Sequence, residues 1–73
     1  MEDFLNIYCD GGARGNPGPA AAAFVAEKNG KVIHKEAKYL GRQTNNQAEY
    51  KATLLALNWL VGQHPKPTIK IIV

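Results

Sequence analysis

The sequence has almost none of the residues that build disulfide frameworks or structural zinc sites. It contains one cysteine, Cys9, and two histidines among 73 residues. A single cysteine excludes an internal disulfide, and without a CxxC pair or a Cys/His cluster the ligand pattern of a structural zinc site is missing. A reducing compartment fits this composition best, so we expect a cytoplasmic protein.

Long apolar runs and a leader pattern are also missing. No apolar stretch approaches the roughly 18 residues of a membrane-spanning helix, and Glu2 and Asp3 are acidic where a signal peptide would be basic. We therefore expect a soluble intracellular protein with no membrane partner. The sequence has neither a GxxxxGK[ST] nor a GxGxxG motif, which disfavours a nucleotide-binding P-loop or a dinucleotide-binding enzyme.

Acidic residues are outnumbered by basic ones. Six acidic and nine basic side chains give a formal net charge of +3, which permits a polyanionic partner without requiring one. A hydrophobic content of 45% with 21% charged residues is typical of a folded globular chain. A chain of 73 residues forms at most one domain, and it buries only about 60% of the surface of its unfolded form, so its stability should be marginal.

The first apolar run, residues 4–9, predicts a strand with a carboxylate at its end. Its Phe, Leu, Ile, Tyr and Cys residues favour a pleated, largely buried strand, and Asp10 followed by two glycines closes it. Glycine and proline then supply the backbone conformations of tight turns, so residues 11–18 predict a compact loop.

Two further strands and a hairpin turn are predicted next. Residues 20–26 are small and apolar, which indicates an inner strand packed closely on both faces. Asn29-Gly30 is a strong hairpin signal, and the charged residues 31–39 predict a solvated edge strand. The three strands together predict an antiparallel meander.

The hydrophobic period changes from 2 to 3.6 over residues 46–61, which predicts one helix. Its apolar face carries Ala48, Ala52, Leu55, Ala56, Trp59 and Leu60. Thr44 with Gln47 matches a capping box, and so does Asn46 with Glu49.

The β-branched residues 68–73 predict a final strand, and the helical crossover is long enough for this strand to lie parallel to the first. The expected fold class is α/β with β-β-β-α-β order: a mixed sheet made of a three-stranded antiparallel meander, one crossover helix and a fourth, parallel strand.

Asp10 and Glu49 are the candidate metal ligands. In a β-β-β-α-β unit the first strand is central and the helix packs across it, so the strand end and the helix start are expected to face one crevice. Mg²⁺ prefers such oxygen ligands and completes its shell with water and phosphate. Each carboxylate also has an ordinary explanation, Asp10 as a turn-starting residue and Glu49 as a first-turn residue that benefits from the helix dipole or bonds back to the Asn46 amide.

Amide, hydroxyl and arginine side chains surround both carboxylates. The amide and hydroxyl residues are Asn16, Thr44, Asn45 and Asn46. They are typical turn and cap residues, and side chains of these types also hydrogen-bond the 2′-hydroxyls that distinguish RNA from DNA. Arg14 and Arg42 are candidate phosphate contacts, although a solvated arginine is the commoner case.

The segment Tyr8-Cys-Asp-Gly-Gly-Ala-Arg-Gly-Asn-Pro-Gly-Pro19, together with Thr44-Asn-Asn-Gln-Ala-Glu49, resembles the ribonuclease H type 1 family over essentially all 73 residues. The resemblance implies a ribonuclease H-like fold and a two-metal endonuclease that hydrolyses RNA in RNA/DNA hybrids, with Mg²⁺ as the ion and Mn²⁺ as an alternative. It implies that Asp10 bridges both catalytic metals, that Glu49 ligates one of them, and that Gly11 belongs to the metal site.

The resemblance also implies a nucleic-acid surface. Its members are Gly12, Ala13, Arg14, Asn16, Arg42, Thr44, Asn45 and Asn46. The three asparagines resemble residues that contact 2′-hydroxyls of the RNA strand, whereas Arg42 and Thr44 resemble contacts to a phosphate of the DNA strand.

Two acids of the family pattern have no counterpart. In the family one acid directly follows the strand equivalent to residues 69–73, and another, with a nearby histidine, lies near the C-terminus. We therefore expect residues 1–73 to be a partial, truncated ribonuclease H-like domain without its C-terminal half, weak or inactive alone, with the activity in the parent protein. The alternative is a non-catalytic ribonuclease H-like nucleic-acid-binding module.

The resemblance further predicts an uncovered surface. Helices cover both sheet faces in the family, and here one face would be bare. An exposed apolar face and an unpaired strand edge favour self-association or binding of a complementing segment.

Overall fold

The computed structural model describes residues 4–63 and 68–72. The elements are β1 (Phe4–Ala13), β2 (Gly18–Lys28), β3 (Lys31–Gln43), α1 (Asn45–Val61) and β4 (Thr68–Ile72), which confirms the predicted β-β-β-α-β order. The acidic N-terminal residues and the last residue of the predicted final strand lie outside the described residues. No helix within the described ranges has the length and apolar character needed to cross a bilayer.

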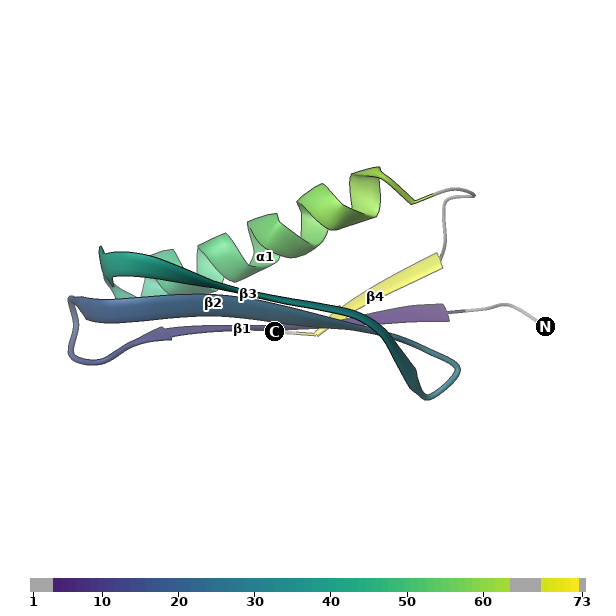
Figure 1. Cartoon of the computed structure of the whole chain (residues 1–73), viewed down its shortest axis with the longest axis horizontal. Coiled ribbons are helices and arrows are strands. Elements are labelled where there is room, and N and C mark those ends of the chain that lie inside the picture. Colours follow the sequence, from purple (N-terminus) through teal and green to yellow (C-terminus); the bar gives the residue numbers. More distant parts are fainter. Residues whose placement is uncertain (1–3, 64–67, 73) are drawn as a thin grey trace.

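The four strands form one mixed sheet in the order β3-β2-β1-β4. β2 pairs antiparallel with both β1 and β3, whereas β4 runs parallel to β1, as predicted. Figure 1 shows α1 lying along one face of the sheet, while no helix of the described chain covers the other face. We call this second surface the open face.

β1 is longer than predicted. It runs through Asp10 to Ala13, which pairs with Ala20 of β2. The predicted loop over residues 11–18 is therefore wrong for its first three residues and for Gly18, where β2 begins, and Asp10 is an internal strand residue rather than the last one. The turn preference of Gly11 and Gly12 is overridden because β2 offers both of them a continuous partner strand.

β2 is an inner strand, but it is not packed closely on both faces. Alternate residues, among them Ala22, Phe24 and Ala26, are buried beneath α1, whereas the residues between them are exposed or half-buried on the open face. The prediction of two packed faces was wrong because a single helix covers only one of them. β3 is the largely exposed edge strand that its charges predict, and it extends to Gln43.

The turn between β2 and β3 forms where the sequence predicts it. Asn29 and Gly30 have positive φ angles of 52° and 78°, a region that asparagine and glycine adopt more easily than other residues. Two such residues in succession match the twist of the flanking strands.

α1 begins at a capping box. The Thr44 hydroxyl accepts a hydrogen bond from the Gln47 backbone N–H at 3.1 Å, and Gln47 Oε1 accepts one from the Thr44 N–H at 2.8 Å. The Thr44/Gln47 prediction is thus confirmed. The Asn46/Glu49 alternative is wrong, because the helix starts at Asn45 and its first turn contains no acidic residue.

Small side chains let α1 lie close to the sheet. Its buried residues are Ala48, Ala52, Ala56 and Leu60. They pack against Leu5, Ile7 and Phe24 of the sheet, with Leu55 and Trp59 partly buried beside them. This confirms the predicted apolar face, and the three alanines leave room for a close helix–sheet approach.

α1 also carries an apolar outer stripe, which we define as Tyr50, Leu54, Leu57 and Val61. These residues follow one another at spacings of four, three and four, and their exposed fractions range from 38% to 71%. A helix that is apolar on two sides is ordinarily buried on both. The outer stripe is therefore a second uncovered apolar surface besides the open face.

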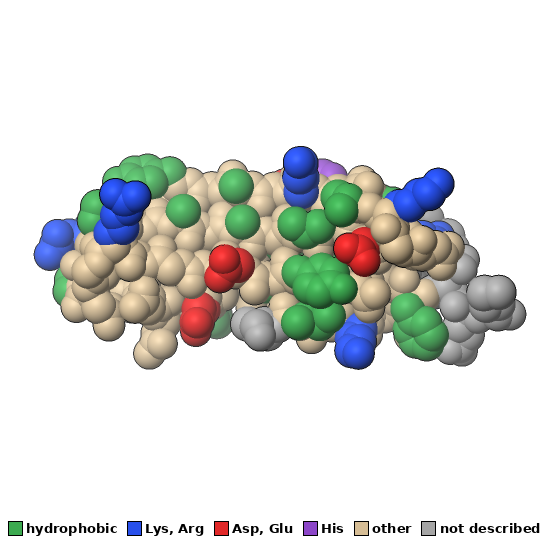
Figure 2. Space-filling view, turned by 90° about the horizontal axis from the view of Figure 1, so that it is seen from below, with side chains coloured by type: hydrophobic (Ala, Val, Ile, Leu, Met, Phe, Trp, Pro, Cys, Tyr) green, Lys and Arg blue, Asp and Glu red, His purple; other side chains and the backbone are tan. Residues whose placement is uncertain are grey.

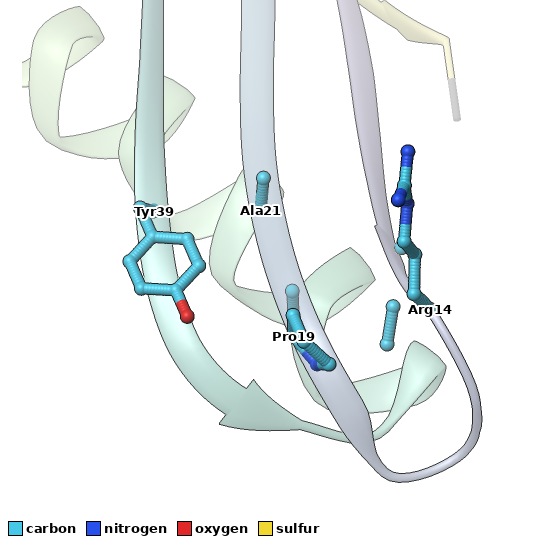
Figure 3. Close-up of a pocket in the computed structure, with 7 residues that line it drawn as sticks. Arg14, Pro19, Ala21 and Tyr39 are labelled. Atoms are coloured by element: carbon cyan, nitrogen blue, oxygen red, sulfur yellow. The ribbon is translucent and has the colours of Figure 1, made fainter.

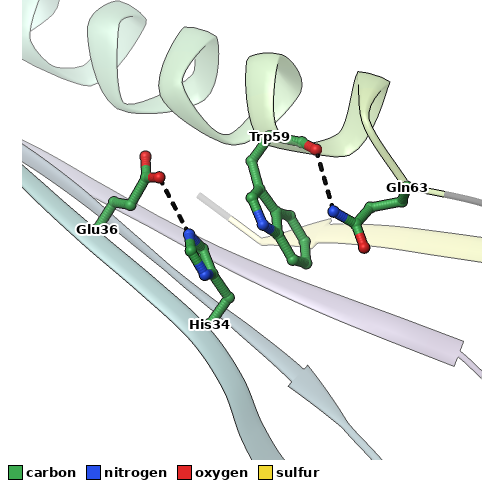
Figure 4. A network of polar contacts seen from close by, with 4 residues as sticks. All are labelled: His34, Glu36, Trp59 and Gln63. Atoms are coloured by element: carbon green, nitrogen blue, oxygen red, sulfur yellow. Dashed lines mark hydrogen bonds and ion pairs between the residues drawn. The ribbon is translucent and has the colours of Figure 1, made fainter.

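Aromatic contacts fix the C-terminal part of α1 to β3. The His34 ring stacks on Trp59 with ring centroids 4.8 Å apart and planes 8° from parallel. His34 Nε2 also lies 3.0 Å from Glu36 Oε1, and Trp59 accepts a hydrogen bond from Gln63 through its backbone carbonyl, as Figure 4 shows. The candidate site residues lie near the opposite end of the helix.

Candidate functional site

β1 and the start of α1 meet at Gly11. A Cβ placed on Gly11 would stand 2.8 Å from the Glu49 backbone nitrogen and would overlap the Ala48 carbonyl. Glycine alone leaves room for such a close backbone approach. Because Gly11 directly follows Asp10, this contact places the backbones of the two candidate carboxylate residues next to each other.

The Asp10 side chain lies on the open face. Exposure alternates along β1, so that Cys9 is buried beneath α1 and Asp10 is exposed. Asp10 therefore does not face the helix side of the sheet, where a crevice shared with the helix start was expected. It can approach Glu49 only around the edge of β1.

Glu49 stands on the flank of α1 that lies over β1. One turn later Thr53 forms a side-chain hydrogen bond with Cys9, and its hydroxyl donates to the Glu49 backbone carbonyl at 3.3 Å. Since residues i and i+4 share a helix face, Glu49 lies on the same flank, one turn nearer the helix start and beside Gly11. The side chain is exposed.

The thiol beneath this flank has a shifted pKa. Burial raises the pKa of Cys9 above its ordinary value, and the side-chain hydrogen bond with Thr53 partly offsets the rise. Cys9 is one of the buried residues of the core. It therefore acts as a small apolar residue, as its sequence context indicates, and not as a reactive thiol.

The free edge of β1 is where Asp10 and Glu49 can meet. β4 pairs with β1 only from Phe4 to Tyr8, so within the described chain no strand covers this edge at Asp10 and Gly11. If a cation bound at this edge, Asp10 and Glu49 would be its candidate carboxylate ligands. Carboxylates and a backbone carbonyl are the hard oxygen donors that suit Mg²⁺.

Few side chains of the described residues could bind a metal ion at this edge. Among residues 4–63 and 68–72 there is no group of three or more His, Cys, Asp and Glu side chains that could hold a metal ion. The oxygen chemistry of Asp10 and Glu49 thus fits Mg²⁺, but two carboxylates form only part of a strong site for two ions.

Two asparagines tie the end of β1 to the start of α1. Asn45 Oδ1 accepts a hydrogen bond from the Ala13 N–H at 2.8 Å, and Asn16 Oδ1 accepts one from the Asn45 N–H at 3.0 Å. The second bond satisfies one of the N–H groups that a helix leaves unpaired at its start. The side-chain oxygens thus have the structural role expected of turn and cap residues.

The same asparagines remain suited to recognition. Both are exposed, and within the described part of the chain their amide nitrogens have no partner, so each keeps its donors for a ligand. Asn46 is exposed beside them in the first turn of α1, and the Thr44 hydroxyl, whose oxygen accepts the cap hydrogen bond, keeps its proton to donate.

The two candidate phosphate-binding arginines meet around Pro19. The Arg14 N–H donates to the Pro19 carbonyl at 2.8 Å, and Arg42 is the register partner of Pro19 on β3. Both arginines are exposed. Arg14 and Arg42, which lie far apart in the sequence, therefore form one basic area. It lies at the same end of the sheet as Asp10.

A shallow hollow opens on the open face beside this basic area. It has a volume of about 390 Å³ and is lined by Gly12, Ala13, Arg14, Pro19, Ala20, Ala21 and Tyr39. Figure 3 shows Tyr39 on one side of it and Arg14 on the other, with Pro19 and Ala21 between them. Sequence analysis did not predict a role for Tyr39, because its position opposite Gly12 depends on the register of three strands.

Comparison with known proteins agrees with the resemblance. The RNase H family model matches residues 2–73. Ribonuclease HI of Halobacterium salinarum (strain ATCC 700922 / JCM 11081 / NRC-1) is 46% identical over 54 residues, which are 73% of this chain and 27% of that protein. Ribonuclease HI of Streptomyces coelicolor (strain ATCC BAA-471 / A3(2) / M145) is 49% identical over 53 residues, 71% of this chain and 23% of that protein.

Solved structures share the fold. LC11-RNase H1 in complex with an RNA/DNA hybrid superposes with a TM-score of 0.84 at 41% identity, over 92% of this chain and 51% of that one. The chain thus spans about half the length of this structure and about a quarter of the two curated relatives. With its four-stranded mixed sheet, its one helix and its family-model match, the chain belongs to the RNase H family.

Proposed function

We propose that this chain supplies the hybrid-binding surface and the first two metal-binding carboxylates of a ribonuclease H that cleaves RNA in RNA/DNA hybrids endonucleolytically. The contact of Gly11 with the Ala48–Glu49 peptide carries the proposal, because it places the backbones of Asp10 and Glu49 next to each other. Membership of the RNase H family and the hybrid bound to LC11-RNase H1 support the choice of substrate.

In this proposal Asp10 and Glu49, with Gly11, hold the metal at the free edge of β1. Mg²⁺ is the expected ion and Mn²⁺ the alternative. Divalent ions held there would supply Lewis-acid stabilisation of the charge that develops on the phosphate oxygens during hydrolysis. Two carboxylates are too few to hold two ions firmly, so we expect the 73-residue chain alone to be weak or inactive and a longer parent protein to carry the activity.

The neighbouring residues position the nucleic acid. The free amide donors of Asn16, Asn45 and Asn46 suit the 2′-hydroxyls of the RNA strand. Arg42, with Thr44, suits a phosphate of the DNA strand, and Arg14 adds positive charge on the same side of the site. Gly12 and Ala13 complete this surface with their backbones.

A non-catalytic module that binds hybrids is the second candidate function. A labelled RNA/DNA hybrid with Mg²⁺ separates the two, with Asp10→Asn as the test variant and Glu27→Gln as a control that removes a carboxylate from β2. We expect cleavage, in the chain or in a longer protein that contains it, to be lost in Asp10→Asn and kept in Glu27→Gln. Equal cleavage by both variants would refute the role of Asp10, and binding without product in every protein would favour the module.

We further propose that the uncovered surface self-associates or accepts a complementing segment. Figure 2 shows the open face, with apolar side chains spread over the strands and basic side chains around its margin. Phe4 and Tyr8 are among its exposed large apolar residues. Exposed apolar areas of this kind on small proteins often mark contact sites.

A further inference from the structure

The hollow beside Tyr39 has a flat floor made of small residues. Gly12, Ala21 and Tyr39 are register partners on the adjacent strands β1, β2 and β3. Since neighbouring strands lie about 4.8 Å apart, the backbones of Gly12 and Tyr39 are separated by about 10 Å. Between them stands no side chain larger than the methyl group of Ala21, so a flat group can lie on the sheet here.

The walls of the hollow are an aromatic ring and a cationic side chain. Tyr39 is 71% exposed, and no residue of the described chain covers its ring. Arg14 and Pro19 stand on the other side, as Figure 3 shows, and the bond between the Arg14 N–H and the Pro19 carbonyl fixes their spacing. An exposed tyrosine ring is a suitable stacking partner for a planar base.

The side chains that line the hollow favour an anionic ligand. None of its lining residues is acidic, while Arg14 lies in its wall and Arg42 is the register partner of Pro19. A ligand that combines a flat, largely apolar ring with negative charge is a nucleotide. Aromatic side chains beside a positively charged groove are the usual means of holding the bases of a single strand.

The hollow also borders the proposed hybrid-binding surface, because Gly12, Ala13 and Arg14 line it. Gly12 is two residues from Asp10, and alternation along β1 puts both on the open face. A base inside a duplex is already paired and stacked, so only an unpaired base can enter. We propose that this hollow binds an unpaired base of a strand that continues beyond the end of an RNA/DNA hybrid; the inference rests on the proposed hybrid binding.

Fluorescence anisotropy in the absence of divalent metal tests the proposal without cleavage. The probes are a blunt labelled hybrid and the same hybrid with a four-nucleotide single-stranded extension at each of its four strand ends in turn. The proteins are the wild-type chain, Tyr39→Ala, Tyr39→Phe and Tyr50→Ala. Tyr50 is the matched control, because it is 66% exposed and lies on the outer stripe of α1.

We expect at least one extension to strengthen wild-type binding by about 5- to 150-fold, the range for stacking one base on an aromatic ring. Tyr39→Ala should lose this gain and still bind the blunt hybrid like the wild type. Tyr39→Phe keeps the ring and should keep the gain, as should Tyr50→Ala.

Three results would overturn the inference. The first is that no extension raises the affinity of the wild-type chain. The second is that Tyr39→Ala lowers the affinity for blunt and extended hybrids by the same factor. The third is that Tyr39→Ala changes the oligomeric state of the chain but not its affinity for any hybrid. The blunt hybrid alone tests the proposed function. A wild-type chain that does not bind it refutes that function, and the nucleotide site with it.

Discussion

Gly11 of β1 lies so close to Ala48 of α1 that any side chain at position 11 would overlap the helix backbone. The contact joins the strand that carries Asp10 to the turn of α1 that precedes Glu49. The geometry of the proposed metal site thus depends on a residue that has no side chain.

Gly11→Ala tests this contact. The added methyl group would overlap the Ala48 carbonyl, so we expect the free energy of unfolding to fall by about 1–3 kcal/mol, the usual range for overpacking, as measured from the urea midpoint. Gly12→Ala is the matched control, because its nearest neighbour would be Asn45 Oδ1 at 3.9 Å and its effect should stay within about 0.5 kcal/mol. Equal losses in both variants would show that the contact does not limit side-chain size.

Asn45 offers a way to separate structure from recognition. Asn45→Ala removes the acceptor for the Ala13 N–H and should lower the free energy of unfolding by about 0.5–1.5 kcal/mol. Asn45→Asp keeps an acceptor and places negative charge at a helix start, where it is favourable, so its stability should stay near wild type. Its hybrid affinity should fall, because the amide donor is lost and the carboxylate repels phosphate.

Urea unfolding and hybrid anisotropy, measured on both Asn45 variants, check this prediction. If Asn45→Asp retained full hybrid affinity, Asn45 would have only the structural role.

The buried thiol predicts a pH dependence of stability. Burial raises the pKa of Cys9 above its ordinary value of 9.0, so the folded chain keeps the thiol proton at a pH where the unfolded chain has lost it. The stability that the buried, protonated thiol contributes is therefore fully present below pH 9.0. It is lost as the pH rises past that value toward the raised pKa of the thiol in the folded chain. The melting temperature of the wild type should fall more steeply than that of Cys9→Ala between about pH 8 and pH 10. Parallel slopes would contradict the predicted contribution.

Association can be assigned to one of the two uncovered apolar surfaces. Val25→Glu places a charge on the open face opposite Lys35, its register partner, and Leu54→Glu places one on the outer stripe, three residues from Lys51. Multi-angle light scattering should show a wild-type mass that rises with concentration, a shift toward monomer in Val25→Glu, and no shift in Leu54→Glu. A monodisperse wild-type monomer would refute self-association, and dissociation by Leu54→Glu instead would move the interface to the helix.

Local patterns predicted most elements correctly because each depends on neighbouring residues. The capping box at Thr44, the Asn29-Gly30 turn and the alanine face of α1 are examples. The boundary of β1 could not be predicted in this way. Gly11 and Gly12 favour turns by themselves and became strand residues only because β2 pairs with them.

By itself, the sequence determined the order of the elements, the place where the helix begins and the two residue types that can bind a metal, since hydrophobic period, capping and side-chain chemistry are local properties. Only the tertiary structure decided that Asp10 lies on the open face, that Glu49 stands beside Gly11 and that Tyr39 lies opposite Gly12. These relationships depend on strand register and on the close approach of helix and sheet, which arise from pairing between distant segments.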